Sequence, residues 1–156
     1  PSPILENINY NKFIDDTYNF FKTSYPDIKF DKISFSNIDK KLKIYADEKQ
    51  LRQVIGNVVK NSLENFQENN ILSKIIIFSS IITQNYIILS IEDNGVGIKE
   101  ANKIKILEPY FTTKKNGTGL GLAISKKIIE DHHGKIIIES SEKGTKVKIK
   151  FPIDSK

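Results

Sequence analysis

Residues 47–63 read DEKQLRQVIGNVVKNSL, and this stretch predicts the long helix around which the rest of the fold is arranged. Asp47, with Gln50 three residues later, resembles a capping box, the side-chain pairing that starts many helices. Apolar residues then recur at helical spacing along one face, and these are Leu51, Val54, Ile55, Val58, Leu63 and Phe66. The helix is expected to end near residues 69–70 and to bury this face.

The segments on either side of this helix predict strand pairs and two further helices. β-Branched runs at residues 75–82 and 86–92 are typical of a hairpin, and a second strand pair is expected around a turn at residues 142–144. The remaining expected elements are helices at 9–23 and 119–133, extended runs at 28–35 and 41–45, and strands at 135–140 and 145–151. We therefore expect helices layered on one face of a mixed or mostly antiparallel sheet.

The composition of the 156-residue chain is that of one globular domain. Hydrophobic residues make up 38% of it, which is too many for a disordered chain, and no apolar run approaches the roughly 18 residues of a membrane span. The chain has no cysteine, which excludes disulfides, thiolate metal sites and a cysteine nucleophile. The net charge of +5 includes a single arginine, Arg52, so nucleic-acid binding is not expected.

Two asparagines on the long helix form the first candidate site. Asn57 and Asn61 lie four residues apart, so their amides emerge from the same face one turn apart. A solvated helix face is the alternative interpretation, but both residues border the apolar face, where a polar group usually has a partner. An amide oxygen is a hard neutral ligand that suits Mg²⁺ when phosphates and water complete the shell.

A carboxylate at the end of an apolar strand forms the second candidate site. Residues 92–98 read EDNGVGI, and the strand's alternation places Asp93 on the same side as the buried Ile91. A carboxylate there needs a donor, and an adenine amino group is one. Gly95 and Gly97 would let the backbone approach a flat ring, although a simple Asp/Asn-Gly turn remains the alternative.

A glycine-rich run before the last helix forms the third candidate site. Residues 116–122 read NGTGLGL, and backbone N–H groups at a helix start can cradle phosphates. The spacing fits neither the dinucleotide fingerprint nor the P-loop. Thr112, Thr113 and Lys114 lie just upstream and could supply hydroxyls and an ammonium to the same phosphates.

Together, the three candidate sites resemble the ATP-binding domain of sensor histidine kinases, within the GHKL superfamily (HATPase_c) of gyrase, MutL and a heat-shock chaperone. Residues 47–63 look like the N box, residues 92–98 like the first Gly box, and EPYFTTKKNGTGLGLAISKKIIEDHHG at 108–134 like the F box joined to the second Gly box. The EPYFTTK and NSLENF forms resemble the nitrogen-sensor subgroup. The resemblance implies a Bergerat-type α/β (α+β) two-layer sandwich, with about five strands covered on one face by about three helices.

The resemblance also implies roles for individual residues. Asn61 would coordinate Mg²⁺, Asp93 would read the adenine amino group with help from Thr145, and residues 99–116 would form a mobile lid. The full nucleotide-binding set is Asn57, Asn61, Asp93, Gly95, Gly97, Ile98, Phe111, Thr112, Thr113, Lys114, Gly117, Thr118, Gly119, Leu120, Gly121, Leu122 and Thr145.

Three positions qualify the resemblance. Glu64 and Asn65 stand where many members have a phosphate-binding Lys and an adenine-stacking Tyr, which puts contacts from that helix turn in doubt. His133 replaces a common Gly. His132 and His133 match the region that closes the family's last helix, so neither is expected to be the phosphoacceptor, and no catalytic residue is assigned within this chain.

The sequence therefore predicts the ATP-binding part of a protein-histidine kinase, acting with ATP and Mg²⁺. The missing Met and the Pro1-Ser2-Pro3 start suggest a fragment, with residues 1–8 ending a linker from a dimerisation domain and residues 9–156 forming the catalytic domain. Expected partners are that dimerisation domain and the receiver domain of a response regulator, in a cytoplasmic homodimer, with the isolated fragment a monomer. The alternatives are a GHKL ATPase and a non-catalytic nucleotide-binding docking module.

Overall fold

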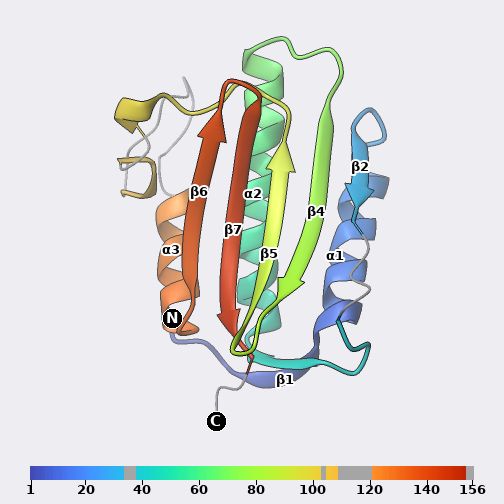
Figure 1. The fold of residues 1–156 in the computed structure, drawn as a ribbon, viewed down its shortest axis with the longest axis vertical. Helices are drawn as coiled ribbons and strands as arrows, with labels where there is room; N and C mark the ends of the chain where they lie inside the picture. Colours follow the sequence, from blue (N-terminus) through green and yellow to red (C-terminus); the bar gives the residue numbers. More distant parts are fainter. Residues whose placement is uncertain (34–37, 103–104, 109–120, 154–156) are drawn as a thin grey trace.

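A five-stranded sheet carries its helices on one face in the computed structural model, which describes residues 1–33, 38–102, 105–108 and 121–153 (Figure 1). The strand order is β2-β4-β5-β7-β6, in which only β2 and β4 run parallel and the other neighbours are antiparallel. The strands are β2 (Lys29–Lys32), β4 (Ile75–Ile82), β5 (Tyr86–Asp93), β7 (Gly144–Pro152) and β6 (Lys135–Ser141). This arrangement confirms the expected mixed, mostly antiparallel sheet.

Three α-helices lie behind the sheet in the described part of the chain: α1 (Tyr10–Ser24), α2 (Glu48–Glu68) and α3 (Gly121–Asp131) (Figure 1). Two short 3-10 helices, η1 (Glu100–Asn102) and η2 (Lys105–Leu107), lie beside the upper end of β6 in Figure 1. The two-layer sandwich expected from the sequence is confirmed.

Asp47 caps the N-terminus of α2, as the sequence predicts. The Oδ1 atom of Asp47 accepts a hydrogen bond from the Gln50 N–H at 3.1 Å. The reciprocal half of the predicted capping box is wrong, because the Gln50 amide donates to the Pro1 carbonyl and the Asp47 N–H donates to Nε2 of His132. The cap therefore joins three parts of the chain: the N-terminus, α2 and the end of α3.

Side chains alternate along the strands, and the inward set forms the core with the buried faces of α1 and α2. Ile87, Leu89 and Ile91 on β5 are almost completely buried, and the next residue of the same parity is Asp93. Burying an Ile or Leu side chain contributes about 1.5–3 kcal/mol, so this alternation fixes which face of β5 points to the helices. Asp93 ends the row, opposite Thr145 on β7 and Ile76 on β4.

The sequence did not predict one small element. Residues Glu6–Asn9 form β1, which pairs antiparallel with β3 (Lys43–Ala46) in a separate two-stranded sheet. Ile4 also donates its N–H to Asp47 at 2.9 Å. The division of the chain at residue 9 stays a prediction, but residues 4–8 contact the folded domain.

Candidate nucleotide-binding site

A cavity of about 310 Å³ lies where the C-terminal end of α2, the end of β5 and the start of β7 meet. These three segments come together at the top of the sheet in Figure 1. Six of the predicted site residues line this cavity, and they are Asn61, Asp93, Gly97, Ile98, Leu122 and Thr145. Segments that are distant in the sequence therefore converge on one cavity.

The Asp93 carboxylate is the charged group deepest in this site, with 8% of the residue exposed. Its Oδ2 atom accepts a hydrogen bond from the Ser62 hydroxyl at 2.6 Å, and its Oδ1 atom accepts from the N–H groups of Gly95 and Thr145 at 3.0 and 3.4 Å. Burial raises the pKa of Asp93 above its usual value, and these three hydrogen bonds partly oppose the rise. The site thus holds a buried acceptor in a fixed orientation.

The loop after Asp93 is fastened at its first residue by a side chain. The Asn94 amide oxygen accepts from the Ile75 N–H at 2.8 Å, and its nitrogen donates to the Ser73 carbonyl at 2.6 Å. Asn94 therefore ties the loop to the start of β4 and does not point a free amide at the cavity.

The far end of the same loop is fastened to β6. The Ile98 N–H donates to the Ser140 hydroxyl at 2.6 Å. Gly97 passes so close to β6 that a Cβ built on it would lie 2.0 Å from the Ser141 carbonyl oxygen. Only glycine fits there, as expected for a residue that shapes the pocket, although its part in binding a base stays a prediction.

The contribution of Asn65, which also lines the cavity, was not predicted from the sequence. Its amide nitrogen donates to the Val96 carbonyl at 3.1 Å, and its amide oxygen accepts from the Val96 N–H at 3.0 Å. The available signal was the spacing, because Asn65 lies one turn after Asn61 and two turns after Asn57. A third amide on that face could have suggested a contact with the loop.

The two asparagines predicted on α2 occupy different environments. Asn61 lines the cavity, whereas the Asn57 nitrogen donates to the Gly121 carbonyl and to the Ser125 hydroxyl, each at 3.1 Å. Asn57 therefore joins α2 to the first turn of α3, next to the cavity. Its predicted contact with nucleotide stays a prediction.

Eight of the predicted site residues lie outside the described residues. They are Phe111, Thr112, Thr113, Lys114, Gly117, Thr118, Gly119 and Leu120. The described parts of the predicted lid, residues 99–102 and 105–108, contribute Lys99, Asn102 and Ile106 to the wall of the cavity.

The oxygen atoms that could bind a metal at the cavity suit Mg²⁺ only if the ion arrives already bound to phosphate. Among the described residues, no group of three or more His, Cys, Asp or Glu side chains could hold a metal ion. Asn61 carries an amide oxygen at the cavity wall, and Mg²⁺ usually takes one or two protein oxygens and fills its remaining positions with phosphate and water.

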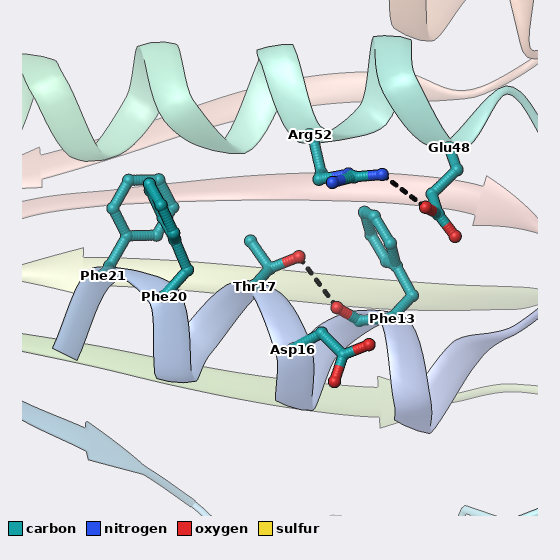
Figure 2. A pocket seen from close by; sticks show the side chains of 7 residues that line it. All are labelled: Phe13, Asp16, Thr17, Phe20, Phe21, Glu48 and Arg52. Atoms are coloured by element: carbon teal, nitrogen blue, oxygen red, sulfur yellow. Dashed lines mark hydrogen bonds and ion pairs between the residues drawn. The ribbon is translucent and has the colours of Figure 1, made fainter. Parts of the chain in front are cut away.

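A second hollow of about 320 Å³ separates α1 from α2 (Figure 2). Its walls are the aromatic rings of α1 and the Arg52 and Glu48 side chains of α2, which form an ion pair. None of the predicted site residues lies there. The cavity at the end of β5 is therefore the candidate nucleotide site.

A family comparison agrees with this assignment. Residues 46–155 match the family described as histidine kinase-, DNA gyrase B- and HSP90-like ATPase. The chain belongs to this family. Within the family it is an ATP-binding catalytic domain of the histidine kinase type, as its relatives and structural neighbours indicate. No helix in the described part of the chain is long and apolar enough to cross a membrane.

Curated relatives include sporulation kinases and a nitrogen regulator. Sporulation kinase E of Bacillus subtilis is 40% identical over 111 residues, which cover 70% of this chain and 15% of that protein. Nitrogen regulation protein NtrY of Azorhizobium caulinodans is 28% identical over 148 residues, which cover 92% of this chain and 18% of the relative. The chain thus spans less than a fifth of the length of these relatives.

Solved structures share the whole fold. The catalytic domain of histidine kinase ThkA, in a nucleotide-free form, is 33% identical with a TM-score of 0.81, over 96% of each chain. ThkA in complex with response regulator protein TrrA is 30% identical with a TM-score of 0.78, and the match covers 97% of this chain and 42% of that one. The predicted family, fold and domain type are confirmed.

Proposed function

We propose that the cavity binds Mg-ATP and that, in the whole protein, this domain presents the γ-phosphate to a histidine on a dimerisation domain. The observation that carries the proposal is the buried Asp93 carboxylate at the cavity, held by Ser62, Gly95 and Thr145. In this proposal the ionised carboxylate accepts a hydrogen bond from the adenine amino group. A charge-assisted hydrogen bond in such a site discriminates strongly between donor and acceptor partners.

The remaining cavity walls suit the rest of the nucleotide. Asn61 would hold Mg²⁺, which when bound neutralises phosphate charge. Leu122 and Ile98 are apolar and would contact the base or ribose, while Lys99 adds a positive charge at the rim. Phosphoryl transfer depends mainly on positioning and electrostatics, so a domain that only orients the nucleotide is a sufficient contribution from this chain.

Asn57 favours the kinase over the alternative of a hydrolytic ATPase. The hydrolytic GHKL ATPases that the sequence resembles use a Glu to activate water at the position of Asn57. An amide at this position cannot accept the proton of the water. The Asn57 nitrogen donates to Gly121 and Ser125, so the side chain is also held in a structural contact.

In the proposal, the acceptor histidine lies on the dimerisation domain and the phosphoryl group then passes to a receiver domain. ThkA in complex with a response regulator supports the second step.

Isothermal titration calorimetry tests the proposal with this chain alone. The chain is expected to bind ATP and ADP in the presence of Mg²⁺, without retaining acid-labile radiolabel and without rapid hydrolysis. Absence of measurable binding at millimolar nucleotide would contradict the proposal and would support a non-catalytic docking module with a degenerate pocket. Label retained by the isolated chain, or fast hydrolysis, would contradict the division of labour between two domains.

A further inference from the structure

Asn65, which lines the cavity, packs closely against Gly95 in the loop after Asp93. Both atoms of the Asn65 amide are engaged by the backbone of Val96, at 3.0 and 3.1 Å. A Cβ built on Gly95 would lie 2.1 Å from the Asn65 oxygen, closer than any real side chain could approach. Glycine at residue 95 is thus needed for the Asn65 amide to keep this position.

The backbone of Gly95 does not itself demand glycine. The only glycine with positive φ in the described part of the chain is Gly144, so an alanine could adopt the Gly95 backbone conformation. The available space is the limiting factor at this position, because the Asn65 side chain fills it. An alanine at residue 95 would have to displace the amide that binds Val96.

The segment that this pair holds in place is a wall of the cavity. Val96, Gly97 and Ile98 all line it, directly after the Asp93 carboxylate. Ser140 holds the far end of the segment through Ile98, and Asp93 itself holds Gly95. Val96 is the intermediate point, it is 40% exposed, and its only described hydrogen bonds are those to Asn65.

We propose that Asn65 is a positioning residue that keeps the 95–98 loop in its nucleotide-binding shape before the nucleotide arrives. This proposal rests on the proposed function, because it concerns the same cavity. Asn65 acts through Val96 and not by contact with the nucleotide. When only a fraction of the molecules have a competent site, the apparent affinity falls by that fraction.

The kinetic consequence separates positioning from direct contact. Removing the amide is expected to slow nucleotide association, because fewer molecules have the loop in place, and to change dissociation less. If Asn65 instead contacted the nucleotide directly, its removal would mainly speed dissociation, where most interface effects appear. The two possibilities therefore differ in which rate constant changes.

The main test compares the wild-type chain with Asn65→Ala. Alanine is the best helix former, so α2 loses no intrinsic stability, and the site is half-buried. Amide exchange measured by NMR without nucleotide is expected to be about tenfold faster at Val96, and unchanged at Ile98, which Ser140 still holds. Stopped-flow binding of a fluorescent ATP analogue is expected to show about a tenfold lower association rate, or about 1.4 kcal/mol in affinity.

Gln67→Ala is the matched control, because it removes an exposed amide two residues further along α2, away from the cavity. It should reproduce the wild-type exchange and binding rates. Equal Val96 exchange in the wild type and Asn65→Ala, or a change confined to the dissociation rate, would overturn the positioning role. If the wild-type chain bound no nucleotide, the proposed function would fail. The exchange rate of the Val96 amide would still test separately whether Asn65 holds Val96.

A double-mutant cycle with Gly95→Ala adds a second, independent test. Gly95→Ala alone is expected to loosen the loop as much as Asn65→Ala, because the new methyl group displaces the amide. In the Asn65→Ala background it should add little to the loss of Val96 protection, because the amide is already gone, although an Asp93 carboxylate oxygen 3.2 Å from the new methyl group must shift slightly. Additive losses in Val96 protection would show that the two positions act separately and would contradict the proposal.

Discussion

The two ends of α2 both carry polar side chains, but these side chains have different roles. At the N-terminal end, Asp47 caps the helix by accepting from Gln50, and its hydrogen bonds with Ile4 and His132 join distant parts of the fold. At the C-terminal end, the Ser62 hydroxyl and the Asn65 amide are directed to the β5 end and the loop after it. One helix therefore has a scaffold end and a site end.

The two carboxylates that contact these ends, Asp47 at the N-terminus of α2 and Asp93 at the end of β5, show the difference most clearly. Hydrogen bonds from the N–H groups of Ile4 and Gln50 lower the pKa of Asp47, so its ionised form is favoured by the fold. Burial raises the pKa of Asp93, so its ionised form is disfavoured by the fold in spite of three donors. A charge that the fold disfavours is typical of a functional site, where a ligand is meant to complete the interactions.

Asp93→Asn is expected to have the largest effect, and only on binding. The substitution keeps the shape but replaces an acceptor oxygen with a donor that faces the adenine amino group. Loss of one charge-assisted hydrogen bond is worth about 1.5–3 kcal/mol, so the nucleotide affinity should fall at least tenfold. Calorimetry measures this loss, and circular dichroism should show that the variant stays folded. Unchanged affinity in a folded variant would exclude Asp93 as the adenine reader.

Acid should weaken nucleotide binding by up to about tenfold per pH unit once Asp93 protonates. Because burial raises this pKa, the loss should begin at higher pH than for an ordinary Asp near 3.8. The folding linkage has the opposite sign: the stability that protonation of Asp93 provides is fully present below its unfolded pKa and is lost as pH rises through the folded pKa. Affinity measured from pH 7 downward, with Asp93→Asn as a flat reference, tests this. Parallel profiles for the two proteins would refute it.

Asp47→Ala is expected to lower stability and leave the cavity intact. Loss of an N-cap costs about 1 kcal/mol, and the Ile4 N–H also loses its acceptor. The stability that the ionised carboxylate provides is present above its unfolded pKa of about 3.8 and is lost as pH falls through the lowered folded pKa. Urea unfolding at neutral pH and at pH 3 should show a smaller difference between the two proteins in acid. A tenfold change in nucleotide affinity would contradict the separation of α2 into a scaffold end and a site end.

The scaffold end could largely be predicted from the sequence, because its signals are local. The Asp47 cap and the apolar face of α2 each depend on residues a few positions apart. What the sequence did not reveal is that Gln50 contacts Pro1 and that His132 accepts from Asp47, since both contacts join segments more than 45 residues apart. The strand β1 was missed for the same reason, because its four residues are defined by pairing with β3.

The site end was predicted for those residues whose chemistry shows in a short motif. The parity of β5 placed Asp93 on the buried side, and the structure confirms that burial. The hydrogen bonds between Asn65 and Val96 were not predicted, because the sequence does not show which loop backbone a polar residue on a helix will contact. The reason for glycine at residue 95 was hidden likewise, since it depends on a neighbour 30 residues away and not on backbone conformation.

His133→Gly should give the smallest effect, a gain in stability with no change in binding. His133 lies in the turn two residues after α3 and has a φ of 62°, in the left-handed region that costs a non-glycine residue about 1–2 kcal/mol. Glycine removes that cost but gives the unfolded chain more freedom, so the net gain should be about 0.5–1 kcal/mol. The His133 and Gly134 N–H groups already donate to Glu130 and Ile129, and the substitution preserves these backbone contacts.

Thermal unfolding of His133→Gly beside the wild-type chain measures this gain, and a matched substitution at the site end sharpens it. Asn70, just past the end of α2, has a φ of 52°, so Asn70→Gly relieves a similar conformation at the other helix. Asparagine tolerates the left-handed region better than histidine, because its short polar side chain can form local hydrogen bonds. The gain at residue 70 should therefore be smaller than at residue 133. Equal gains, or a loss at residue 133, would mean that the His133 side chain makes a compensating contact and that backbone strain does not decide the stability of this turn.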